Sequence, residues 1–217
     1  MAKPSDVLSM LSLAAFLISG MPLTYANLIV NGSFENPVYS GTYEHLGPTE
    51  LPGWSTFSSY SGTVLFTTAY NPVSDGNQAV QIEVPGDWIS QDFATVVGAQ
   101  YELTFDLMAY TGYGGPGLGY APCPCITLLD VNVGPISTTV ESTSAGYQTE
   151  TLDFTAISPT TTLTFTNPSS PPGWGNYPEL DNVSVVEVSA VPEPATLVLL
   201  IIAVGAAGLA TKRTVVF

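Results

Sequence analysis

Apolar and polar residues alternate with a period of two through the middle of the chain. Residues 101–110 (YELTFDLMAY) place tyrosine, leucine and phenylalanine on one face. The segments 151–156 and 162–166 alternate leucine, phenylalanine or alanine with threonine and aspartate. Successive side chains of a strand point to opposite faces, so each segment is predicted to be a strand with one buried face.

Short runs rich in β-branched and aromatic residues predict further strands. Turn-forming clusters such as Asp75-Gly76-Asn77 separate these runs, and no segment between residues 27 and 190 has a convincing helical period. The pattern therefore predicts an all-β fold, a single jelly-roll or β-sandwich domain. The additional strands are expected at 63–68, 79–84, 88–94, 126–133 and 182–188.

The first 26 residues have the pattern of a signal peptide. Lys3 supplies the positive start, residues 7–20 are apolar, and Thr24-Tyr25-Ala26 forms a small-x-small cleavage site. We expect an N-terminal signal helix that is removed after Ala26. The alternative is a membrane anchor, for which the apolar stretch is short.

A second apolar stretch, residues 195–210, is followed at once by Lys212 and Arg213. It lies near the lower limit of length for spanning a bilayer, and the basic pair stands where a cytoplasmic stop signal belongs. We therefore expect a C-terminal transmembrane helix that holds the body outside the membrane. The expected divisions are a signal peptide at 1–26, a body at 27–190 and a sorting or anchor segment at 191–217.

Pro192, Glu193 and Pro194 stand directly before this stretch. The motif, the short apolar helix and the basic end, in that order, resemble the PEP-CTERM sorting signal of Gram-negative bacteria. The resemblance implies that an exosortase recognises the motif and cleaves nearby, after transient anchoring in the inner membrane. The protein would then reach the cell surface or an exopolysaccharide matrix such as a biofilm. A plain C-terminal membrane anchor is the alternative.

The charge balance excludes whole classes of partner. The chain has 18 acidic residues, three basic residues and one histidine, for a formal net charge of −15. Lys3, Lys212 and Arg213 all lie at the ends, so residues 27–191 contain neither lysine nor arginine. Nucleic acid is excluded as a partner, because nothing would neutralise its phosphates. A multi-histidine metal site is excluded too, and a Ser-His-Asp triad could use only His45.

Six segments of the body form an ordered set of motifs. They are Asn27–Glu35 (NLIVNGSFE), 51–54 (LPGW), 75–82 (DGNQAVQI), 89–93 (ISQDF), 98–105 (GAQYELTF) and 179–185 (ELDNVSV). Together they resemble a galactose-binding-like jelly-roll family of unknown function, found in plant cell-wall and bacterial surface proteins. Carbohydrate-binding modules share the opening and closing segments. The resemblance implies a β-sandwich and a glycan ligand, and it implies no catalyst.

Aromatic residues in glycine- and proline-rich loops are the candidate glycan-binding residues, because aromatic rings stack against the apolar face of a sugar ring. The candidates are Trp174, Tyr177, Tyr113 and Tyr120. Core packing is the commoner role of tryptophan. We expect it for Trp54, whereas Trp88 at the start of a strand suits either role.

Cys123 and Cys125 lie in the same loop region as two of these tyrosines. Two cysteines in an exported chain suggest a disulfide, although a bond across a single residue is strained. A local disulfide is favoured slightly over free thiols.

Glu35 and Asp181 are the candidate metal ligands. The inferred jelly roll places the first and last strands side by side, which would bring the two carboxylates together at one sheet edge. Without lysine or arginine, the counter-charge is a proton, backbone N–H groups or a metal ion. Calcium takes carboxylate and carbonyl oxygens, and the resemblance to carbohydrate-binding modules also implies a structural calcium here. The Ser33 carbonyl is the expected third ligand, and the alternative is that backbone N–H groups or solvent meet both carboxylates.

These features predict a non-catalytic, exported surface or exopolysaccharide-matrix protein that binds a glycan and is sorted by an exosortase. The alternative is a structural matrix protein without a small ligand. A glycoside hydrolase is the weakest reading, because the acidic residues admit many pairs and nothing marks one of them.

Overall fold

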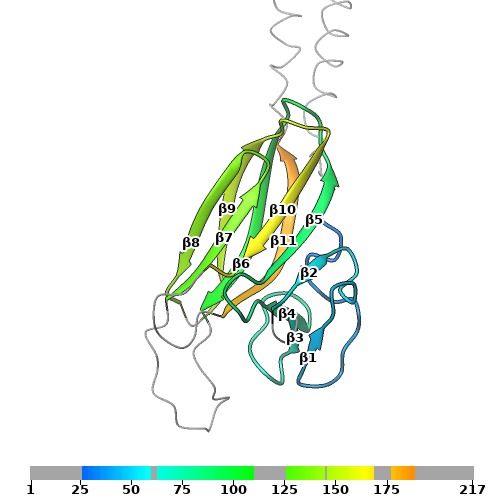
Figure 1. Cartoon of the computed structure of the whole chain (residues 1–217), viewed down its shortest axis with the longest axis vertical. Coiled ribbons are helices and arrows are strands. Elements are labelled where there is room, and N and C mark those ends of the chain that lie inside the picture. Colours follow the sequence, from blue (N-terminus) through cyan, green and yellow to red (C-terminus); the bar gives the residue numbers. More distant parts are fainter. Residues whose placement is uncertain (1–25, 60–62, 110–125, 145, 169–176, 189–217) are drawn as a thin grey trace, which may run out of the picture. The chain divides into compact units, whose positions relative to one another are not determined.

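The computed structural model describes residues 26–59, 63–109, 126–144, 146–168 and 177–188 (Figure 1). All of them fall in one compact unit, Ala26–Val188. The strands of this unit are β1 (Tyr43–Leu46), β2 (Ser55–Phe57), β3 (Thr63–Thr67), β4 (Gln78–Gln81), β5 (Trp88–Ala94), β6 (Gln100–Ala109), β7 (Thr127–Val133), β8 (Ile136–Ser142), β9 (Gln148–Thr155), β10 (Thr160–Thr166) and β11 (Pro178–Val188). No helix within these ranges is long and apolar enough to cross a membrane.

The strands form two sheets in which every neighbouring pair is antiparallel. The six-stranded sheet has the order β1-β3-β4-β11-β6-β9, and the five-stranded sheet has the order β2-β5-β10-β7-β8. Strands β8, β7, β10 and β5 run side by side across the upper part of Figure 1. The predicted all-β sandwich is therefore confirmed.

The core fills the space between the inner faces of the two sheets. From β6, Leu103, Phe105 and Leu107 are fully buried, as the alternation predicted, and from β10 so are Leu163 and Phe165. The rings of Phe105 and Phe165 meet edge to face with centroids 5.0 Å apart. Each such side chain contributes about 1.5–3 kcal/mol by leaving water, so these two strands hold the sheets together.

The eight strands expected from the sequence all occur in the structure, and three others were missed. β1 and β2 are short edge strands with mostly exposed side chains. β8 is also an edge strand, and its sequence ISTTVES buries only its last residue. Edge strands need no strong apolar face, so the pattern of alternation does not reveal them.

The N-terminal segment lies along β11, as the expectation for adjacent chain ends required. The Leu28 amide donates to the Val185 carbonyl at 2.8 Å, and the Val183 amide donates to the Gly32 carbonyl at 2.9 Å. The segment is nevertheless not a regular strand, because Asn31 adopts a φ of 55° and the chain turns there. Gly32 is needed at this contact, since a Cβ atom would lie 2.0 Å from the Val183 carbonyl oxygen.

Candidate functional site

The Glu35 and Asp181 carboxylates both bind the loop 74–78. Oε1 of Glu35 accepts the amides of Asn77 and Gln78, each at 2.7 Å. Oδ2 of Asp181 accepts the amides of Ser74 and Asp75, each at 2.8 Å, and the Ser74 hydroxyl at 3.1 Å. The two acidic side chains thus fasten the two ends of one short loop.

Local backbone geometry makes this arrangement possible. Strand β11 bulges between Asp181 and Ser184, and Asn182 there has a φ of 50°. The bulge brings the Asn182 amide to 2.7 Å from Oδ1 of Asp181. Gly76, with a φ of 67°, sits against Glu35, and a Cβ atom there would lie 2.5 Å from Oε1. A bulge commonly redirects a side chain in this way, and only glycine fits the close approach.

A proton, backbone N–H groups or a metal ion could each have balanced the charges of Glu35 and Asp181. The structure shows backbone N–H groups bound to both carboxylates. Ser33 lies in the turn that precedes Glu35. Among the described residues, no group of three or more His, Cys, Asp or Glu side chains is placed to hold a metal ion. Calcium binding by Glu35, Asp181 and Ser33 stays a prediction.

A third carboxylate, Glu179, lies beside this site and was not singled out from the sequence. It is 0% exposed; its Oε1 accepts the side-chain amides of Asn71 at 2.6 Å and Gln81 at 3.0 Å, while Oε2 has no hydrogen-bond partner. The sequence signal was available, because Glu179 and Asp181 flank the core residue Leu180 and therefore share the opposite face of β11.

Burial sets the protonation of these acids. It raises the pKa of Glu179 to about 8, although the hydrogen bonds from Asn71 and Gln81 lower it. Burial likewise raises the pKa of Asp181 to about 6 against the lowering effect of its amide donors. Burial also raises the pKa of Tyr147, and Glu179, Asp181 and Asp106 add to the shift. The side chain of Glu179 is therefore protonated at neutral pH.

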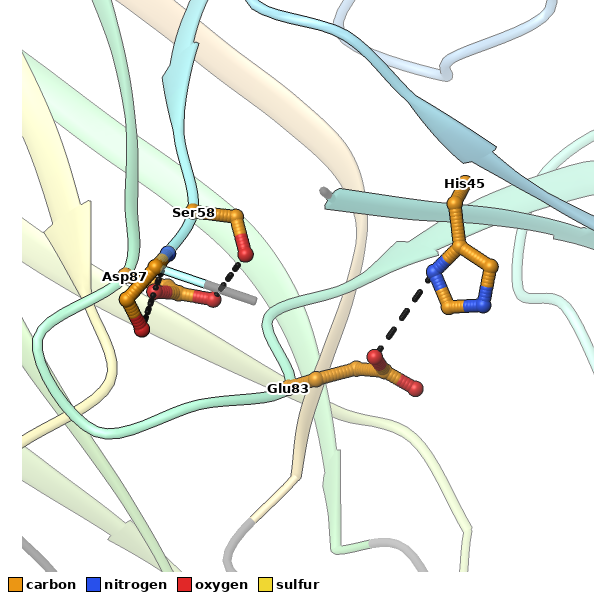
Figure 2. Close-up of polar contacts among 5 residues, drawn as sticks. His45, Ser58, Glu83 and Asp87 are labelled. Carbon is orange, nitrogen blue, oxygen red and sulfur yellow. Dashed lines mark hydrogen bonds and ion pairs between the residues drawn. The ribbon is translucent and has the colours of Figure 1, made fainter. Parts of the chain in front are cut away.

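Figure 2 shows two further polar pairs. His45 Nδ1 lies 3.7 Å from Oε2 of Glu83. The Ser58 hydroxyl donates its proton to the buried carboxylate of Asp87, which also accepts the Ser59 amide at 2.7 Å.

The tryptophans of the described residues take different positions. Trp54 is 4% exposed and lies 5.5 Å from the ring of Phe34, so the expected core role is confirmed. Trp88 is only partly buried and stacks on Phe57, with ring centroids 6.0 Å apart and an interplanar angle of 17°.

Two family comparisons bear on the chain. Residues 27–186 match the model of a family described as "Protein of unknown function (DUF642)". The chain belongs to the DUF642 family. Residues 190–213 of this DUF642 chain match the PEP-CTERM protein-sorting motif, which marks an exported protein that is sorted to the cell surface. No curated protein matches the chain.

Solved structures similar to this DUF642 chain include carbohydrate-binding modules. A CBM4 structure is 16% identical with a TM-score of 0.42, and covers 74% of this chain and 99% of its own. A CBM61 module in complex with β-1,4-galactotriose is 13% identical with a TM-score of 0.45, covering 75% and 99%. A family 16 carbohydrate-binding module is 19% identical with a TM-score of 0.44, covering 74% and 100%. At these values the likeness assigns no ligand to the DUF642 chain.

Among the predicted glycan-binding residues, the structure describes Tyr177, which is partly buried directly before β11. The remaining predicted glycan-binding, disulfide and sorting residues, and the segments expected to form terminal helices, lie outside the described residues. Those residues are Trp174, Tyr113, Tyr120, Cys123, Cys125, Pro192, Glu193 and Pro194.

Proposed function

We propose that the chain is a non-catalytic glycan-binding protein of the cell surface or exopolysaccharide matrix of a Gram-negative bacterium. The observation that carries this proposal is the sorting motif at residues 190–213, which supports export of the β-sandwich body to the cell surface, where polysaccharides are available as ligands. The composition supports it, because the body has no lysine or arginine and His45 is its one histidine, which removes most basic groups from which a catalytic site could be built.

An exosortase is the proposed processing partner. It would recognise Pro192, Glu193 and Pro194 while the apolar stretch 195–210 holds the chain transiently in the inner membrane. The basic pair Lys212 and Arg213 supports this orientation, since basic residues favour the cytoplasmic side. Cleavage would then release the body to the cell surface or the exopolysaccharide matrix.

Loop aromatic residues are the proposed glycan contacts of this function. Trp174 and Tyr177 are close in sequence in a proline-rich segment, and Tyr113 and Tyr120 occupy a glycine-rich one. Tryptophan and tyrosine provide a large apolar face with a polar group at its edge, which suits a sugar ring.

The test is binding of the protein purified from the cell surface to an array of plant and bacterial polysaccharides. We expect retention on at least one of them, and about tenfold weaker binding for Trp174→Ala, equivalent to about 1.4 kcal/mol. A folded protein that binds none of the polysaccharides would instead support a structural matrix role. Unchanged affinity in Trp174→Ala would remove that residue from the site.

A further inference from the structure

An aromatic pair and a row of polar side chains share the outer face of the five-stranded sheet. Phe57 is 47% exposed and Trp88 is partly buried, while their chain neighbours Thr56 and Ile89 point into the core. Both rings therefore lie on the outer face, where they stack in nearly parallel planes, with an interplanar angle of 17° and centroids 6.0 Å apart, and together form an aromatic platform. Two adjacent aromatic rings kept partly in water and bordered by polar side chains are a candidate ligand contact, because exposed apolar patches with a polar rim mark binding sites.

Hydrogen bonds fix this platform in place. Asp87, which precedes Trp88, is 1% exposed and accepts hydrogen bonds from Ser58 and Ser59, which follow Phe57 (Figure 2). The register of the strands sets Phe57 directly opposite Trp88. A buried carboxylate thus locks the ends of β2 and β5 together. Binding to such a prearranged surface loses little conformational entropy.

The strand register extends the platform into a polar row across the sheet. Trp88 is opposite Thr166, Thr166 is opposite Asp130, and Asp130 is opposite Thr139. With neighbouring strands about 4.8 Å apart, the row from β2 to β8 is about 19 Å long. The Thr139 hydroxyl donates to Asp130 at 2.6 Å, which orients this carboxylate. The next row in register consists of serine, threonine and asparagine side chains.

We propose that this face, from Phe57 and Trp88 across Thr166 to Asp130, binds a neutral polysaccharide. The proposal rests on the proposed glycan-binding function and adds a site and a ligand class to it. Ring faces fit the apolar side of a sugar ring, and hydroxyl and carboxylate groups accept the hydrogen bonds of its hydroxyls. Uronate or sulfate polymers are excluded, because residues 27–191 offer no lysine or arginine to pair with them.

A second copy of the chain is the other candidate occupant of such a face. The formal net charge of −15 opposes association of two copies, and a row of threonine and aspartate is poorer in apolar area than stable dimer interfaces. A neutral glycan is not repelled by the negative charge and does not need a large apolar interface, so the observations favour a glycan as the occupant.

The experiment measures retardation of the purified, processed protein in gels that contain neutral xylan, mannan, galactan or β-glucan, or anionic polygalacturonate. Phe57→Ala and Trp88→Ala are compared with Tyr43→Ala, a matched control that removes a 48% exposed ring from β1 of the other sheet. Circular dichroism establishes that each variant is folded. Phe57 is an exposed edge residue, so this variant keeps the test valid if Trp88→Ala fails to fold.

We expect binding to at least one neutral polymer, a loss of about tenfold or more in Phe57→Ala and Trp88→Ala, and no change in Tyr43→Ala. Neutral-polymer binding that both variants retain but Trp174→Ala loses would overturn this site and leave the proposed function standing. Absence of binding to every polymer would overturn both. Binding to polygalacturonate alone would overturn the proposed neutral ligand. A dimer that Phe57→Ala converts to a monomer would show that a second copy of the chain, and not a glycan, occupies this face.

Discussion

Glu179 shows how burial of one residue couples stability to pH. Its ordinary pKa of 4.5 rises to about 8 in the folded chain, because the side chain is buried and no cation lies among the described residues to pair with it. The folded state therefore binds this proton more tightly than the unfolded state. The stabilising effect is complete below pH 4.5 and is lost as the pH rises through 8.

Glu179→Gln removes the titrating group and therefore tests this coupling between pH and stability. The free energy of unfolding of the native chain should fall between pH 5 and pH 8 by up to a few kcal/mol, since each pKa unit is worth about 1.4 kcal/mol. Asp181, raised from 3.8 to about 6, adds a smaller fall at the acidic end. Glu179→Gln should flatten most of the change. Urea unfolding at several pH values measures it.

Glu44→Gln on the exposed edge strand β1 is the control for this prediction. Its profile should follow that of the native chain. Parallel profiles for the native chain and Glu179→Gln would show that Glu179 does not hold the proton assigned to it.

The predicted calcium site can be tested by melting the protein with and without the ion. If Glu35, Asp181 and the Ser33 carbonyl bind the ion, the melting temperature should be higher in calcium than in EDTA. Binding to the native state alone gives about 2.7 kcal/mol at a hundredfold excess over the dissociation constant. Glu35→Gln should abolish the difference. Equal melting temperatures in the two buffers would show that the amides of the loop 74–78 are the whole counter-charge.

At the scale of elements, the sequence predicted the strands that have a strong inner face. β6 and β10 alternate apolar and polar residues, and the structure confirms both with buried inner faces. The missed β8 pairs with β7 through backbone groups and buries little side-chain area, which leaves no periodic signal. The bulge in β11 was also missed, because the positive φ of Asn182 depends on tertiary contacts and not on local propensity.

For the candidate sites too, features that follow from local sequence patterns were predicted, whereas features that depend on the register between strands were not. Adjacency of the chain ends was expected from the sequence, whereas the loop 74–78, whose two ends bind Asp181 and Glu35, was not. The Phe57 and Trp88 platform did not follow, since β2 was not predicted and its register with β5 is a long-range property. Trp88 could be assigned to neither core nor surface from the sequence, because its stacking on Phe57 depends on the pairing of β2 with β5.

At the scale of the whole molecule, every basic residue lies outside the body. Residues 27–194 contain no lysine or arginine, whereas the C-terminal segment 195–217 contains Lys212 and Arg213. Strand β11 ends at Val188, so only a short stretch separates the sandwich from the apolar segment at 195. Seven residue steps span at most about 25 Å, so if the apolar segment spans the membrane as predicted, a protease that cuts beside the motif would act close to the membrane surface.

Because of this charge distribution, trypsin distinguishes the processed form from the unprocessed form. A form released after cleavage near Pro192, Glu193 and Pro194 has no site for trypsin, which cuts after lysine and arginine. Its intact mass after denaturation and trypsin treatment should be unchanged and should correspond to a chain that begins at Asn27 and ends near residue 194. A chain that keeps its anchor should instead lose its last residues to trypsin. Glu193→Ala should convert the released form to the anchored one, and a native surface form that still carries residues 197–217 would establish a plain membrane anchor in place of exosortase processing.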